Sequence, residues 1–402
     1  MLFAVWVVTR LLIFFKISYT LGLEADIEIY FKYAAEILRG LVPYRDFAIE
    51  YPPGALPFFL LPKLLAGDVF SYRRFFVAEV MLVDFIGLLL ILYYGRKHGF
   101  SPRHVYFTGL LYVVLPAVIG LVGCQRFDFI PAVLVLGAII LLDKGYRVWA
   151  WALLGLGFAV KLYPVILTPV FLISAWREKS LKRDVLYGLP VFALTAAVVW
   201  LPFLAAAGPK FWFFLSYHAS RGIQLESFYS TILLVARWFG YPVSTEFSYG
   251  SWNVVSQVSP VLAKMSFFVM GTLMSLVLVH SLAVAQNGSP TDGDIPRQAL
   301  LMVMAFIIGG KVLSPQYLLW LIPLLVIALR EDSRYRRKVW VAFALLTLIS
   351  FLIYPVNYKG LIDLRLWPSL LILARNGLLL AVFYLLLKNG SVNRQPRKAS
   401  ET

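Results

Sequence analysis

Residues 185–205, VLYGLPVFALTAAVVWLPFLA, form an uninterrupted apolar run without one charged side chain, and the basic segment WREKSLKRD (176–184) precedes them. A transmembrane helix needs about 20 consecutive apolar residues. The run has this length, so it is predicted to cross a membrane. The Lys and Arg residues before it indicate the cytoplasmic end of the helix, because short cytoplasmic loops carry an excess of basic side chains.

Comparable apolar runs recur along all 402 residues, which are 60% hydrophobic and have a mean hydropathy of +0.79. This composition excludes an ordinary soluble domain and predicts an all-α integral membrane protein with about 10–12 transmembrane helices. A single polytopic membrane domain is expected over residues 1–388, followed by a short basic cytoplasmic tail over residues 389–402. The predicted spans are residues 2–20, 76–94, 105–122, 129–142, 148–160, 164–176, 185–205, 261–285, 299–310, 317–330, 339–355 and 368–387.

The charges between the spans predict which side of a plasma membrane each loop faces. Short basic loops at residues 95–103, 143–147, 176–184 and 330–338 are typical of the cytoplasm. With these loops inside, both chain ends are cytoplasmic and the remaining polar clusters face the extracytoplasmic side. The same bias, together with anionic lipid headgroups, explains the net charge of +16 without nucleic acid. Charged groups near hydrocarbon are costly, so the polar clusters indicate function.

The first outer loop is predicted to contain a helix over residues 23–40 that lies near the membrane surface. At about 100° per residue, Asp26 shares a stripe with Tyr30 and Tyr33 and has no basic neighbour on that stripe. Burial without a cation raises the pKa of a carboxylate and makes it a better proton acceptor. Asp26 is therefore the candidate catalytic base. The alternative is a helix N-cap, a position where Asp is favoured.

The next segment, YRDFAIEYPP (44–53), adds the carboxylates Asp46 and Glu50 to this loop. Its prolines restrict the backbone, so the loop can hold a carboxylate in place at low entropic cost. Both acids are candidate sugar or acceptor contacts, although Asp46 can instead pair with Arg45. Residues 53–65 contain further prolines and are expected to lie at the membrane interface rather than to span it.

Two more clusters follow short apolar segments. In QRFD (125–128), Arg126 and Asp128 either pair with each other or separate, with Arg126 on an anion and Asp128 on sugar hydroxyls. Lys161 lies between two short apolar segments, where a lysine is costly unless it meets an anion. Snorkelling towards water is the alternative for this lysine. Tyr163, two residues later, is a further candidate sugar contact.

The loop over residues 206–260 and the start of the span at 317–330 hold the last clusters. The loop is rich in aromatic residues, which are typical of a membrane interface, and polar residues interrupt it. In KVLSPQY (311–317), a helix starting after Ser314 would direct its partly positive end at an anion. A histidine in such a loop is more often structural than catalytic. The candidate site residues in these segments are His218, Arg221, Glu226, Lys311 and Gln316.

These side chains together indicate a substrate that carries a lipid-linked phosphate. Basic groups at a membrane surface suit a phosphate, and carboxylates and tyrosines suit sugar hydroxyls. Nucleotide-activated sugars are cytoplasmic, so an outward-facing transferase needs a donor carried on a membrane lipid. The candidate donor-phosphate ligands are Arg126, Lys161, Arg221 and Lys311. The candidate sugar or acceptor contacts are Tyr30, Asp46, Glu50, Asp128, Tyr163, His218, Glu226 and Gln316.

The order of these motifs resembles that of glycosyltransferase family 87 over nearly the whole chain. The resemblance is carried by D-x-x-x-Y at 26–30, G-x-x-P-Y-x-D-x-x-x-E-Y-P-P at 40–53, R-F-D at 126–128, V-K-L-Y-P at 160–164, R-G-I-Q-L-E-S at 221–227 and S-P-Q-Y at 314–317. It implies the fold of a C-type glycosyltransferase, with interfacial helices in the first outer loop and an active site outside the cytoplasm.

The resemblance further implies inverting transfer of a sugar, with mannose expected, from a polyprenyl-phosphate donor to a hydroxyl of an envelope glycan or glycolipid. Asp26 is then the general base. No nucleotide or metal cofactor is expected, because the basic residues can neutralise the phosphate. The expected partners are the donor, the acceptor and membrane lipids. A lipid-linked sugar transporter or flippase is the main alternative, although transporters place their sites near the bilayer midplane. A non-catalytic subunit of a glycan-building complex is a weaker one.

Overall fold

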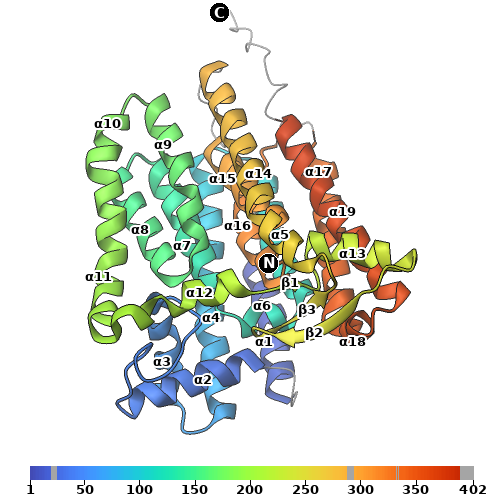
Figure 1. Cartoon of the computed structure of the whole chain (residues 1–402). Coiled ribbons are helices and arrows are strands. Elements are labelled where there is room, and N and C mark those ends of the chain that lie inside the picture. The colour runs from blue at the N-terminus through green and yellow to red at the C-terminus, as the bar shows by residue number, and fades with distance from the viewer. Residues whose placement is uncertain (20–24, 288–293, 332, 334, 390–402) are drawn as a thin grey trace, which may run out of the picture.

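The computed structural model describes residues 1–402 except 20–24, 288–293, 332, 334 and 390–402. The described chain forms a bundle of helices, and shorter helices and a small sheet gather at one end of it (Figure 1). Residues 390–402 of the predicted cytoplasmic tail lie outside the described residues. The fold is therefore mostly helical, as the apolar runs predict.

Six helical segments of the described chain are long and apolar enough to cross a membrane. They are α4 (Val69–Lys97), α5 (Pro102–Ile119), the segment Leu181–Ser220 with α10 (Leu181–Arg183), α11 (Leu189–Ala207) and α12 (Phe213–Ser220), α14 (Ser259–Asn287), α17 (Arg336–Phe351) and α19 (Leu366–Asn389). Shorter apolar helices lie among them: α1 (Leu2–Tyr19), α7 (Phe129–Asp143), α8 (Arg147–Val160), α9 (Thr168–Arg177), α15 (Asp294–Gly309) and α16 (Leu318–Ala328). Every predicted span falls on one of these helices.

The helix α4 begins seven residues before the predicted span at residue 76, and a capping interaction explains the difference. The Asp68 carboxylate accepts hydrogen bonds from the backbone N–H groups of Phe70 at 2.7 Å and Ser71 at 3.1 Å. These bonds satisfy donors that the first helical turn leaves without partners. The added turn carries Arg73 and Arg74, whose charges end the apolar run that the sequence shows.

The loops predicted to be cytoplasmic meet at one end of the bundle, which we call the basic end. His98 contacts Asp143 at 2.8 Å, and the backbone N–H of Ser101 donates to Glu331 at 2.5 Å. These contacts connect three basic loops that are far apart in the sequence. The other end, which we call the polar end, holds α2 (Ala25–Leu38), α3 (Leu56–Leu65), α6 (Leu121–Gln125), α13 (Phe228–Trp238) and α18 (Tyr358–Ile362) (Figure 1).

A three-stranded antiparallel sheet, which the sequence analysis did not predict, lies at the polar end. Its strand order is β1-β3-β2, with β1 (Ile223–Gln224), β2 (Ser244–Ser248) and β3 (Ser251–Val255). Tyr249 and Gly250 form the two-residue turn between β2 and β3, both with positive φ, as a tight hairpin of this hand requires. Strand β1 follows α12 and pairs with β3. The sheet therefore fixes the position of the residues that follow Arg221.

A buried ion pair connects three helices inside the bundle. Arg10 of α1 contacts Asp84 of α4 at 2.8 Å, and the Trp6 indole N–H also donates to Asp84, at 2.7 Å. The guanidinium reaches the Val113 carbonyl of α5 at 2.7 Å. Both charged side chains are buried. The charge at Arg10 is thus balanced inside the bundle, away from the polar end.

We expect Asp84→Ala to destabilise the protein strongly, because Arg10 would remain buried without its counter-ion. Losing one partner of a buried pair costs about 3–5 kcal/mol, whereas replacing both with apolar groups is close to neutral. The measurement is the thermal midpoint of the protein in detergent. The double variant Arg10→Leu with Asp84→Leu should recover most of the loss. An equal loss in the single and double variants would contradict this account.

Candidate active site

The candidate base Asp26 lies in the first turn of α2 and forms an ion pair with Arg126, which directly follows α6. The side chains are 18% and 24% exposed, so the pair is partly accessible at the polar end. The sequence analysis expected Asp26 to have no basic neighbour, because it considered only one stripe of one helix. The counter-ion instead comes from a segment about a hundred positions further along the chain.

Asp128 and Lys161 form a second, more buried ion pair, with Nζ and Oδ1 at 2.6 Å. The Trp320 indole N–H donates to the same oxygen at 2.7 Å. The amine also lies 4.6 Å from the Phe127 ring centroid and 5.1 Å from that of Trp320. Arg126 and Asp128 therefore separate, each with another partner. Lys161 is held inside by a carboxylate and two aromatic rings rather than snorkelling.

Among the described residues, no carboxylate forms an ion pair with Arg221, the third cation of this cluster. It ends α12 and lies close enough to Arg126 and Lys161 for their charges to repel. Its Nε is buried without a hydrogen-bond partner, and the described residues provide no ion pair to it. The described cluster thus has more cations than carboxylates, an arrangement that favours an anion.

Lys311 adds a fourth cation beside Arg221. Its amine donates to the Ala219 carbonyl at 2.7 Å, and it lies 5.3 Å from the Phe267 ring centroid. Burial, and then the charge of Arg221, lower the pKa of Lys311. The four donor-phosphate candidates are therefore neighbours in the fold, although they come from four separate segments.

Glu50 connects the first outer loop to α12. The Tyr217 hydroxyl forms a hydrogen bond with the Glu50 side chain, and His218 forms one with the Glu50 backbone. Tyr30 lies behind this contact and is buried, with its ring stacked on Phe59 at 4.2 Å between centroids. Glu50 and His218 are accordingly placed near the cationic cluster, and Tyr30 supports them from the hydrophobic side.

Three candidate sugar contacts bond to or pack against neighbouring protein groups. Asp46 pairs with Arg45 at 2.9 Å, and this bond, together with one from the Val42 N–H, lowers the pKa of Asp46 to about 2. Gln316 bonds to the Ser314 hydroxyl. Tyr163 is stacked on Trp320 at 4.2 Å between centroids, and its buried hydroxyl has no hydrogen-bond partner among the described residues. Asp46 therefore forms the ion pair with Arg45 that was the alternative to a sugar contact.

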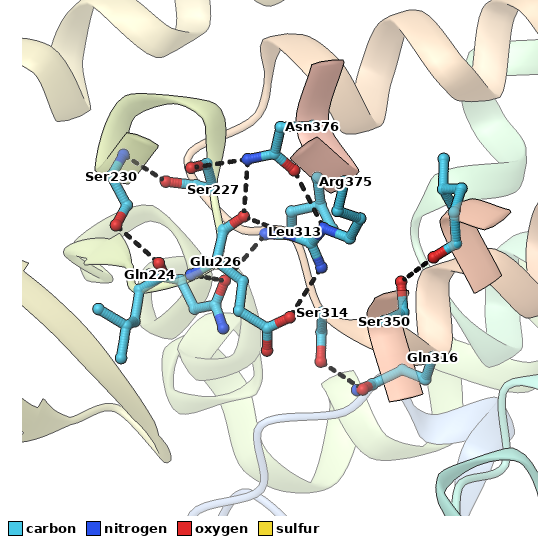
Figure 2. A network of polar contacts seen from close by, with 12 residues as sticks. Gln224, Glu226, Ser227, Ser230, Leu313, Ser314, Gln316, Ser350, Arg375 and Asn376 are labelled. Carbon is cyan, nitrogen blue, oxygen red and sulfur yellow. Dashed lines mark hydrogen bonds and ion pairs between the residues drawn. The ribbon is translucent and has the colours of Figure 1, made fainter. Parts of the chain in front are cut away.

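Glu226 is the centre of a buried network that ties the loop to α19 (Figure 2). Arg375 donates to its carboxylate at 2.7 Å and to its carbonyl at 2.5 Å. Asn376 reaches the same carbonyl at 3.3 Å and the Thr231 hydroxyl at 2.7 Å. Burial raises the pKa of Glu226 in spite of this cation. The network fixes the chain that follows Arg221.

The structure adds residues that the sequence analysis missed. Trp320 lies inside an apolar span, where a tryptophan gives no polar signal. Tyr354 and Tyr358 lie close enough to Arg126 to interact electrostatically, and Tyr358 also faces Arg221. Tyr354 lies at the end of the predicted span 339–355 and Tyr358 lies just beyond it, so their spacing of four residues was the available signal. Among the residues described, no three His, Cys, Asp or Glu side chains form a group that could hold a metal ion.

The described residues thus form a multi-helix membrane bundle with acids and an excess of cations at one end. The family model for glycosyltransferase family 87 matches residues 49–315, two thirds of the chain, and the chain belongs to this family. It is therefore a membrane glycosyltransferase. The match begins after Asp26, Tyr30 and Asp46 and ends before Gln316. No curated protein matches the chain.

Proposed function

We propose that the protein transfers mannose, with inversion, from a polyprenyl-phosphate donor to a hydroxyl of an envelope glycan or glycolipid at the extracytoplasmic surface. The observation that carries the proposal is the convergence of Asp26, Arg126, Lys161 and Arg221 at the polar end. That end is opposite the basic loops, which are typical of the cytoplasm. A lipid-linked phosphate reaches such a site from the membrane, where a nucleotide sugar is absent.

The cations stabilise the phosphate that leaves. As the bond between the sugar and the phosphate breaks, negative charge grows on the phosphate oxygen, and groups that bind it more strongly in the transition state accelerate the step. Arg221 is the main ligand because no carboxylate neutralises it. Lys161 is held by Asp128 and contributes N–H donors of fixed position.

Asp26 accepts the proton of the attacking hydroxyl. Without substrate its carboxylate pairs with Arg126. A donor phosphate competes for Arg126, so donor binding releases Asp26 towards the acceptor. Glu50 and His218 are the proposed direct contacts to sugar hydroxyls. The remaining sugar-contact candidates bond to or pack against other protein groups and act by positioning these groups: Tyr30, Asp46, Asp128, Tyr163, Glu226 and Gln316.

We expect Asp26→Asn to reduce transfer by about 10²–10⁴-fold, the usual contribution of a general base. Donor binding should be unchanged or tighter, because the substitution frees Arg126 from its counter-ion. Product formation is followed by mass spectrometry, and donor binding is measured separately on the same preparation. Glu28→Gln, an exposed acid in the first turn of the same helix, is the matched control. Near-normal turnover in Asp26→Asn would remove this residue from the role.

We expect Arg221→Gln to weaken donor binding and to lower transfer by about 10²-fold or more, a loss typical of removing one group that stabilises an oxyanion. Arg39→Gln is the control, because Arg39 is 71% exposed and directly follows the last residue of α2. Donor titrations and initial rates give both quantities. If Arg221→Gln and Arg39→Gln bind the donor equally well, Arg221 is not a phosphate ligand.

We expect purified protein in detergent, without a sealed compartment, to form product from polyprenyl-phosphate mannose. A flippase would produce no new glycosidic bond under these conditions. A panel of polyprenyl-phosphate sugars with mass spectrometry identifies the donor. Activity should persist in EDTA, because Arg126, Arg221 and Lys311 carry the charge that a divalent ion would otherwise supply. Loss of activity in EDTA that Mg²⁺ or Mn²⁺ restores would contradict the metal-free mechanism.

A further inference from the structure

A groove of about 530 Å³ lies at the polar end between the first outer loop and the start of α12. Residues 44–48 form one wall, and residues 209–216 form the other. The Lys210 amine donates to the Arg45 carbonyl at 3.3 Å and joins the two walls. Tyr44 anchors the first wall from below, with its hydroxyl donating to the Tyr51 carbonyl at 2.6 Å.

Both walls of the groove lead to Glu50. On one side Phe213 lines the groove, and its ring lies 5.9 Å from that of Tyr217, which bonds to Glu50. On the other side Phe47 lines the groove and lies 6.1 Å from the ring of Tyr33, which also interacts with Glu50. Tyr217 and Tyr33 therefore lie between a ligand in the groove and the carboxylate that borders the cationic cluster.

The chemistry of the groove suits a sugar chain. Trp212 and Phe213 expose aromatic surface, at 44% and 38%, that can cover the apolar face of a sugar ring. Lys210 supplies N–H donors and the Ser216 hydroxyl supplies an acceptor for sugar hydroxyls. Arg45 is neutralised by Asp46, so the lining keeps a single net positive charge, that of Lys210.

The position of the groove also fits a glycan above the bilayer. The apolar side chains Leu194, Val198 and Leu201 of α11 are exposed, so this helix faces lipid. The groove starts where α11 ends, at residues 208–212. A glycan that enters here stays on the water side of the lipid-facing helix.

We propose that this groove binds the acceptor glycan and determines acceptor specificity. The inference rests on the proposed function and adds to it a second site, separate from the donor phosphate site. The acceptor lies along residues 209–216, and the hydroxyl that reacts points past Glu50 towards Asp26. The ligand is an oligosaccharide, which is either free or linked to a lipid.

The test uses Trp212→Ala and Lys210→Ala in the full-length protein, with α-mannobiose and its octyl glycoside as probes. Binding of each probe is measured by saturation-transfer NMR without donor, so this readout does not depend on catalysis. We expect each variant to weaken probe binding by about tenfold or more, because a buried aromatic ring is a typical binding hot spot. Stronger binding of the octyl glycoside than of free mannobiose would assign the natural acceptor to the lipid-linked class.

Transfer kinetics supply the second readout. We expect a raised acceptor KM with unchanged kcat and unchanged donor binding in both variants. Trp367→Ala is the matched control, because Trp367 is an aromatic residue with 60% exposure at the start of another span. Equal effects of Trp212→Ala and Trp367→Ala would identify a membrane-interface role and overturn the proposal. Probe binding that survives both groove substitutions would also overturn it. Absence of transfer by the wild type, with probe binding that the substitutions abolish, would refute the proposed reaction and leave the groove as a glycan site.

Discussion

Mutual repulsion among Arg126, Lys161 and Arg221 is the constraint on which the polar end depends. Like charges near a medium of low dielectric raise the free energy of the folded state unless carboxylates or a ligand compensate them. Asp26 and Asp128 compensate two of the three cations. Arg221 keeps an uncompensated charge, which the bundle holds in place. The uncompensated charge thus makes the folded state less stable, and the anion site is already formed before the substrate binds.

Breaks in helices place these cations at the polar end. Gly120, with a φ of +75°, separates α5 from the short α6 that carries Arg126 outwards. Lys161 ends α8. The first outer loop is held against this end of α8 by Gly54, because a Cβ at that position would lie 2.5 Å from the Ala159 carbonyl oxygen. A side chain there would push the loop with Glu50 away from the cluster.

The sequence predicted the positions of the apolar helices and the gathering of the polar clusters at one end. Both predictions follow from the cost of charge in hydrocarbon and from the alternation of successive loops between the two sides of the membrane. The sequence was insufficient for the partners of each charge. Asp128 pairs with Lys161 rather than Arg126, and Glu226 pairs with Arg375, which was counted as part of a span. Pairs between distant helices depend on how the helices pack, and one sequence does not contain that information. The sheet was missed because its strands are short and partly exposed.

Pairing of Asp26 with Arg126 gives the proposed reaction an order. While Arg126 holds the carboxylate, the base is a poor proton acceptor, because a neighbouring cation favours its charged form. The donor is a phosphodiester with one negative charge, and a second charge develops as polyprenyl phosphate leaves. Arg126 is therefore drawn from Asp26 to the phosphate as the glycosyl bond breaks, which restores the basicity of Asp26 when the acceptor hydroxyl loses its proton. The same coupling limits transfer of the sugar to water, because the base becomes active only when the phosphate is bound and the acceptor occupies the adjacent groove.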